Sequence, residues 1–135
     1  MLGEQFGDVK GKVTGQRILD VEGPTIETSL TASGSLKGAQ IKETPTFIGR
    51  PTNTSSGIIH GIGKGVIRAG ESELATVTGK GIGRIDSLGS INWRSSLFFS
   101  TSSTGKLASL NNLIGVFEAV IDAEGNFSEK TWEWK

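Results

Sequence analysis

Cysteine is absent from the 135-residue sequence, and histidine occurs once, as His60. Zinc sites usually take several Cys or His ligands, so the composition argues against a metal centre and excludes disulfides. The chain also has no Gly-x-Ser-x-Gly elbow, and His60 would be the sole base of a serine hydrolase. We therefore expect no metal site and no cofactor, and no motif marks a residue as catalytic.

An excess of charge of one sign is also missing, because 14 Lys and Arg residues balance 14 Asp and Glu residues. With no basic tail and no Tyr, the chain is not expected to bind nucleic acid. No apolar run approaches the roughly 18 residues of a membrane-spanning helix. The first residues have neither the positive nor the apolar region of a signal peptide. We expect no membrane insertion and a cytoplasmic location.

Glycine, in contrast, is abundant, with 20 residues, about twice the average share of roughly 7%. It lacks the strict every-third-residue period of collagen, so it indicates turns or close backbone approaches. Turn signals divide the chain into eight segments rich in Val, Ile, Thr or Phe with alternating polarity. The predicted strands are 8–21, 25–36, 39–49, 57–68, 74–85, 90–101, 112–122 and 127–135.

These strands predict a closed sheet. No segment is patterned as a crossover helix, so consecutive strands are expected to pair as antiparallel neighbours. An even number of such strands can close and so remove both edges. We predict one all-β domain over residues 1–135, an eight-stranded antiparallel up-and-down β-barrel. Such an interior is filled by side chains or holds one small ligand, and the sequence leaves both outcomes open.

Two predicted strands, 57–68 and 74–85, alternate glycine with larger residues. A hairpin centred near residue 72 would set the glycines opposite one another and leave a patch without side chains. Glycine weakens a strand interior by roughly 0.5–1 kcal/mol relative to alanine, so bulky side chains, a ligand or a sharp bend should compensate. The glycines of this patch are Gly61, Gly63, Gly65, Gly79, Gly81 and Gly83.

The predicted ligand-binding residues are those that alternation places inside the barrel. The aromatic members are Trp93, Phe99, Phe117, Trp132 and Trp134. Arg17 and Glu43 fall on otherwise apolar inward sets, and a buried charge needs a partner. Both could orient a polar ligand group near the cavity mouth or form a structural ion pair. Alternatively, a bulge near Pro45 could reverse the facing of a strand.

The second half of the chain resembles a known group. The segments that carry the resemblance are HGIGKG at 60–65, TGKGIGR at 78–84, INWRSSLFF at 91–99 and WEWK at 132–135. They are similar to uncharacterised prokaryotic proteins grouped with allene oxide cyclase-like barrels. The resemblance implies an eight-stranded barrel with an interior cavity, often in oligomers, and in the plant enzyme the cyclisation of a fatty-acid epoxide. The plant site includes a cysteine that this chain lacks, so only the fold carries over.

Apolar residues also recur on the predicted outer face, where no helix is available to cover them. They are Ile58, Ile62, Val66, Ile82, Phe98, Ile114, Val116 and Val120. An apolar stripe on a barrel exterior indicates a partner, so we predict a homo-oligomer, a dimer or trimer, that buries parts of the fourth to seventh strands. Basic residues on this face, such as Lys64 and Arg84, form a solvated wall or attract an anion.

Three functions fit these patterns. The first is a non-catalytic barrel that binds an apolar or amphipathic small molecule. The second is a cyclase- or isomerase-type enzyme in which Glu43 is the base. The third is a structural or assembly protein with a filled barrel.

Overall fold

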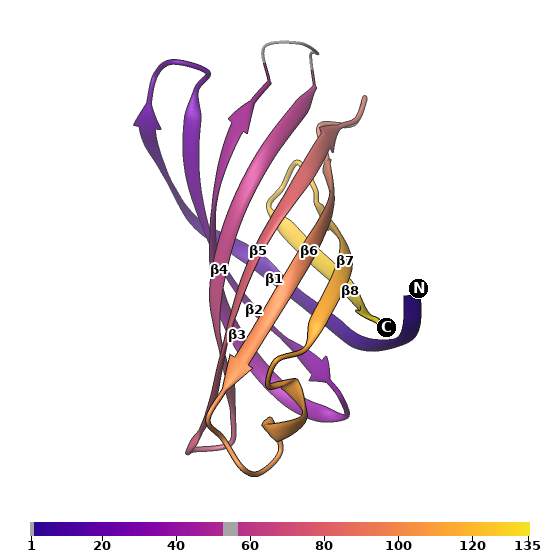
Figure 1. The fold of residues 1–135 in the computed structure, drawn as a ribbon. Helices are drawn as coiled ribbons and strands as arrows, with labels where there is room; N and C mark the ends of the chain where they lie inside the picture. The colour runs from indigo at the N-terminus through magenta and orange to yellow at the C-terminus, as the bar shows by residue number, and fades with distance from the viewer. Residues whose placement is uncertain (1, 53–56) are drawn as a thin grey trace.

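A computed structural model describes residues 2–52 and 57–135 and forms a closed barrel with the strands in chain order (Figure 1). The elements are β1 (Leu2–Asp20), β2 (Thr25–Leu36), β3 (Ala39–Pro51), β4 (Ile58–Ala69), β5 (Glu73–Ile85), β6 (Ile91–Thr101), the 3₁₀ turn η1 (Ala108–Leu110), β7 (Ile114–Ile121) and β8 (Asn126–Trp134). Every neighbouring pair is antiparallel, including β1 with β8. The predicted all-β barrel is therefore confirmed.

Strand positions follow the prediction closely, except that β1 begins at Leu2 rather than at residue 8. Residues 53–56, in the turn expected between the third and fourth strands, lie outside the described part of the chain. Within residues 2–52 and 57–135, no helix is long and apolar enough to cross a membrane.

The glycine-rich hairpin forms with a register two residues away from the predicted one. Gly61 pairs with Gly81 and Gly63 pairs with Gly79. The last pair of the ladder is Ala69 with Glu73, so the turn is centred at residue 71 rather than at residue 72. A shift of two residues preserves the facing of every side chain. The inward glycine patch is therefore present although its predicted pairing was wrong.

Two turns at the same end of the barrel are built alike. Asp86 accepts hydrogen bonds from two backbone N–H groups, at 2.9 and 3.1 Å, and from a side-chain amide at 3.0 Å. Asp122 accepts the corresponding three hydrogen bonds in the β7–β8 turn. These bonds lower the pKa of both aspartates. Gly89 and Gly125 then take positive φ angles of 82° and 87°, which favour glycine.

The opposite end of the barrel is closed by the segment that contains η1. Leu107 and Leu110 are fully buried there, and Figure 1 shows η1 below the ends of β6 and β7. Glu73 fixes this segment because its carboxylate accepts the backbone N–H groups of Lys106, at 2.6 Å, and Leu107, at 2.9 Å. These hydrogen bonds lower the pKa of Glu73.

The β1–β2 hairpin extends past the end of the neighbouring strand β8. β1 pairs with β8 as far as Lys12 opposite Asn126, whereas its pairing with β2 continues to Asp20. In Figure 1 this hairpin rises away from the β7–β8 turn. Ile18 and Val21, near its tip, are exposed. The barrel thus has one end closed by a packed loop and one end where the wall is uneven in height.

Candidate functional site

A cavity of about 90 Å³ lies inside the barrel. At about 30 Å³ per water-sized group, it has room for roughly three such groups. Its wall combines apolar side chains with the glycine patch, which contributes backbone. The larger apolar lining residues are Leu30, Phe47, Trp93, Leu97, Phe117, Ile121 and Phe127.

The indole of Trp93 occupies the space that the glycines leave. A Cβ atom added to Gly61 would lie 2.6 Å from Cζ3 of Trp93, and one added to Gly83 would lie 3.0 Å from Cδ2. Phe47 packs edge-on against the same indole, with ring centroids 5.1 Å apart. Of the three ways in which the glycines could be compensated, a bulky side chain is therefore the one found at Gly61 and Gly83. Its buried Nε1–H has no hydrogen-bond partner among the described residues.

Glu43 projects into this interior from β3, as the alternation predicted. Its neighbours across the ladders are Ala32 on β2 and Ile67 on β4. The residue is 7% exposed, and one carboxyl oxygen lies 3.4 Å from the Cβ position of Gly65. Within the part of the chain that the structure describes, nothing hydrogen-bonds to the carboxyl group. Glu43 is thus a cavity-lining acid without a protein partner there.

A second acid, Glu129 on β8, lines the same cavity. It lies between Val9 on β1 and Ala119 on β7 and is 9% exposed. The hydroxyl of buried Thr131 donates a hydrogen bond to Oε1 of Glu129 at 3.1 Å. The sequence reasoning missed Glu129 because it assigned the alternate residues of this strand to the interior. Phe127, an apolar residue two positions earlier and on the same face, could have indicated the correct assignment.

Burial dominates the electrostatics of the two acids. It raises the pKa of Glu43 to about 8, with a further increase from the negative charge of Glu129. Burial also raises the pKa of Glu129 to about 7, against the opposing effect of the Thr131 hydrogen bond. No Lys or Arg among the described residues is buried, so none neutralises the pair from within the core. Lys64 borders the cavity, but its side chain is exposed.

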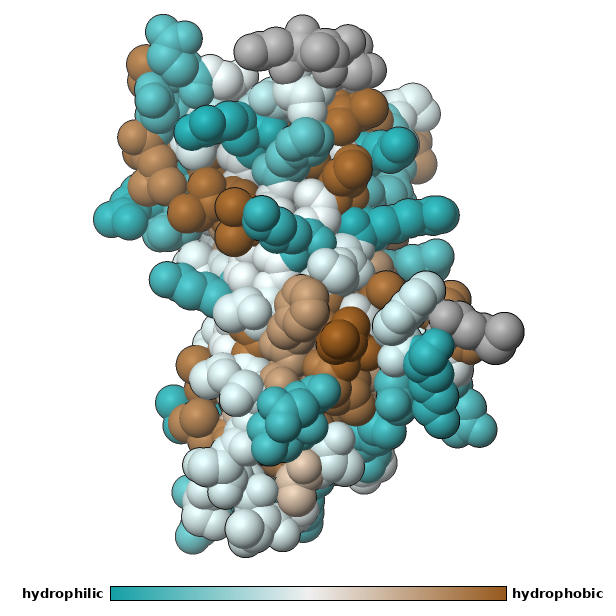
Figure 2. Space-filling view, in the orientation of Figure 1, coloured by the Kyte–Doolittle hydropathy of each residue, from teal (hydrophilic) through white to brown (hydrophobic). Residues whose placement is uncertain are grey.

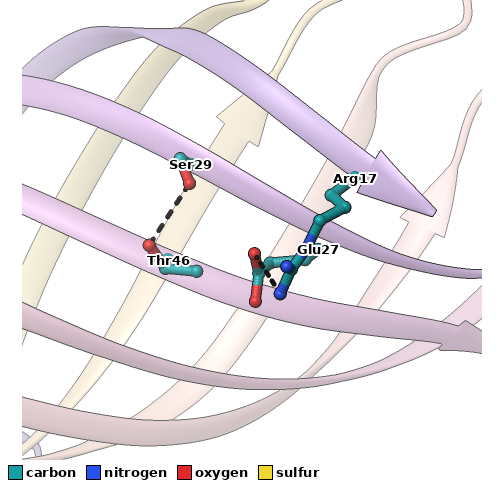
Figure 3. A network of polar contacts seen from close by, with 4 residues as sticks. All are labelled: Arg17, Glu27, Ser29 and Thr46. Carbon is teal, nitrogen blue, oxygen red and sulfur yellow. Dashed lines mark hydrogen bonds and ion pairs between the residues drawn. The ribbon is translucent and has the colours of Figure 1, made fainter. Parts of the chain in front are cut away.

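Arg17 does not join Glu43, and the prediction that it faces inward was wrong. The β1–β2 register shifts between Val13 and Gly15, so one extra residue reverses the facing of β1 from Gly15 to Ile18. The Arg17 side chain is 71% exposed, and its Nη2 lies 3.4 Å from Oε1 of Glu27. Figure 3 shows this pair and the nearby hydroxyl contact between Ser29 and Thr46. The proposed bulge near Pro45 is absent, since described β2–β3 pairs keep one register.

Trp132 and Trp134 do not reach the cavity either, so their predicted inward facing was also wrong. β8 pairs Glu129 with Ala119, which directs the tryptophans of this strand outward. Trp132 lies opposite Val116, and Trp134 is 54% exposed.

The two phenylalanines predicted as ligand-binding residues both lie inside the barrel, at different levels. Phe117 is half-buried and lines the cavity. Phe99 is buried but does not line it. It packs edge-on against Phe6, with ring centroids 5.9 Å apart.

Comparison with known proteins identifies the fold. No family description and no curated protein matches the sequence. A protein of unknown function from Clostridium acetobutylicum is similar in structure, with a TM-score of 0.75, 16% identity and coverage of 98% of each chain. A conserved protein of unknown function from Rhodopseudomonas palustris has a TM-score of 0.75, 11% identity and coverage of 99% of each chain. At these identities the likeness shows a shared fold alone.

Proposed function

We propose that the protein binds a small amphipathic molecule inside the barrel. The observation that carries this proposal is an apolar cavity lined by a carboxyl group, that of Glu43, without a hydrogen-bond partner among the described residues. Buried polar groups are normally hydrogen-bonded, because an unpaired one loses its interactions with water. Ligand pockets combine apolar walls with a few polar groups that orient the ligand. A bound molecule with a polar group would supply the partner that Glu43 lacks.

The cavity volume sets the size of the ligand. An apolar cavity of about 150 Å³ holds benzene, so a cavity of about 90 Å³ suits a group of roughly three to four heavy atoms. The ligand is therefore a short molecule, or the short end of a longer one.

A glycine substitution tests the proposal with a matched control. A Cβ atom added to Gly63 would meet ordinary contacts, the nearest being Cβ of Phe47 at 3.4 Å, and Gly63 lines the cavity. Gly63→Ala should fold. It should weaken the binding of 1-propanol by at least threefold, as measured by NMR of the Trp93 indole. Gly15→Ala adds a methyl group with nothing within 4 Å, away from the cavity, and should bind as the parent does. Equal affinity in all three proteins would contradict the proposed site.

A second candidate function is a cyclase- or isomerase-type enzyme in the same cavity. It is favoured by the two pKa values, about 8 for Glu43 and about 7 for Glu129. General acid–base groups act best when their pKa lies near the working pH. Under this alternative Glu43→Gln would bind substrate and lose turnover, whereas a binding protein has no turnover to lose.

We also propose that the protein forms a homo-oligomer, in which a second copy of the chain covers exposed apolar side chains. Phe98 on β6 pairs with Ile114 on β7, and Leu2 on β1 pairs with Trp134 on β8. All four side chains are exposed on the outer face. Figure 2 shows apolar patches separated by hydrophilic side chains on the face that it presents. Light scattering that gives only the 14.2 kDa monomer mass at micromolar concentration would contradict this part.

Membership of the allene oxide cyclase-like group and a cytoplasmic location remain proposals that rest on the sequence. The cavity favours ligand binding over a barrel filled only for structural purposes.

A further inference from the structure

We propose that the ligand is a small organic cation, a short alkylamine, whose ammonium group binds between Glu43 and Glu129 while its carbon chain contacts the aromatic wall. This inference rests on the proposed function, because it names the chemical class of the molecule in the same cavity.

The first argument is charge. Glu43 and Glu129 are both at least nine-tenths buried, and a buried acid needs either a proton or a cation to balance it. The charged side chains on either side of them along β3 and β8, and on the strands beside these, are exposed on the outer face. These are Lys42, Arg68, Asp8, Lys10, Glu118 and Lys130. A cationic ligand would balance the two acids from inside the cavity.

The second argument is hydrogen-bond capacity. Ionised carboxylates only accept hydrogen bonds, and an alkylammonium group offers three donors and no acceptor. Glu129 receives one hydrogen bond, from Thr131, and Glu43 receives none from the described residues. The four carboxylate oxygens therefore keep more free accepting positions than a ligand hydroxyl, with its single donor, can fill. An ammonium group matches this excess.

The third argument is the nature of the wall. Phe47, Trp93, Phe117 and Phe127 line the same cavity as the two acids. Aromatic faces attract cations, more strongly where the cation is desolvated, and they also contact the alkyl chain. One cavity thus offers both groups that an alkylammonium ion requires.

Binding should depend on pH in a direction that identifies the cation. Because burial raises the pKa of Glu43 to about 8 and that of Glu129 to about 7, the pair holds protons at neutral pH. An ammonium ion favours the ionised acids, so its binding releases protons. Its affinity should therefore rise with pH between 6 and 8.5, by up to about tenfold per pH unit for each proton released. The uncharged 1-propanol lacks this dependence.

The experiment compares n-propylamine, 1-propanol and propionate at pH 6 and pH 8.5. Binding is followed by NMR of the indole N–H of Trp93, with outward Trp132 and Trp134 as internal controls. We expect n-propylamine to bind at least tenfold more tightly at pH 8.5 than at pH 6, and more tightly than 1-propanol at pH 8.5. Propionate should not bind.

The double variant Glu43→Gln, Glu129→Gln should lose at least tenfold in amine affinity and keep 1-propanol affinity within threefold. The NMR spectrum of the double variant without ligand reports whether this variant is folded. The comparison of the parent protein at the two pH values does not depend on the variant. If 1-propanol binds and n-propylamine binds no more tightly than 1-propanol at pH 8.5, the proposal of a cationic ligand is contradicted and the proposed binding function stands. If none of the three molecules shifts the Trp93 signal, both proposals fail.

Discussion

Glu129 raises the pKa of Glu43 across the barrel interior, although the two acids lie on strands that do not pair, β8 and β3. Both project from positions where each ladder neighbour is apolar. Desolvation is the largest cause of the raised pKa in each case. The pair therefore links the protonation of the cavity to the stability of the barrel.

Stability should fall as the pH rises through the neutral range. Both acids have folded-state pKa values above the ordinary 4.5, so folding takes up protons. The stability they contribute is complete below about pH 4.5 and is lost as the pH passes 7 to 8. Glu43→Gln should stabilise the protein by about 2–4 kcal/mol at pH 9 and change it little at pH 5. Urea unfolding at both pH values measures this.

Glu118→Gln provides the matched control for that substitution. Glu118 is exposed on the outer face, with one oxygen 3.9 Å from Nη2 of Arg94, and such surface pairs contribute little. Its variant should unfold like the parent at both pH values. A Glu43→Gln variant that showed the same difference from the parent at pH 5 and pH 9 would contradict the buried-acid account.

Gly61→Ala should destabilise the barrel by about 1–3 kcal/mol, because its new Cβ would overlap the Trp93 indole and overpacking carries such a cost. In the Trp93→Phe background the same substitution should cost less, since the smaller ring frees the space. A double-mutant cycle by chemical unfolding measures this coupling. Equal costs in the two backgrounds would show that the glycine serves another purpose.

Glu73→Gln should loosen the segment that closes one end of the barrel. The carboxylate of Glu73 accepts the N–H groups of Lys106 and Leu107, and a neutral amide oxygen is a weaker acceptor. Hydrogen exchange of these two amides should accelerate several-fold, while exchange in β2 stays unchanged. Unchanged exchange at Lys106 and Leu107 would mean that the burial of Leu107 and Leu110 alone holds the segment.

The three tryptophans should differ in their access to solvent. Trp93 is 6% exposed and Trp134 is 54% exposed, so acrylamide should quench Trp134 efficiently and Trp93 weakly. Trp134→Phe should reduce the quenched fraction of the fluorescence, and Trp93→Phe should remove the component that resists quenching. Similar quenching of both residues would contradict the assigned facing of β6 or β8.

The general architecture could be predicted because it depends on properties that each segment shows by itself. Turn residues mark the strand ends, and alternation in β4 and β5 gives the facing of the glycines even when the pairing is two residues out. The inward facing of Glu43 could be predicted for the same reason, since β3 keeps one alternation through the residues that pair with β2.

The side chains whose facing was missed or wrongly predicted are those whose facing depends on the pairing between strands. One extra residue between Val13 and Gly15 turns Arg17 outward, and nothing in the local alternation marks that insertion. In β8 the two tryptophans occupy the outward set, so a rule that places the largest apolar residues inside assigns the strand backwards. The pairing of β8 with β1 and β7 fixes Glu129 in the cavity.

The most direct test of the buried acidic cavity is a carbon-13 NMR titration of the side-chain carboxyl carbons of Glu43 and Glu129. The account predicts that both titrate above pH 6, with coupled curves near pH 7 and 8. Glu129→Gln should then lower the pKa of Glu43, because it removes the neighbouring negative charge. Two independent titrations near pH 4.5 would contradict the account, because they would place both carboxyl groups in water.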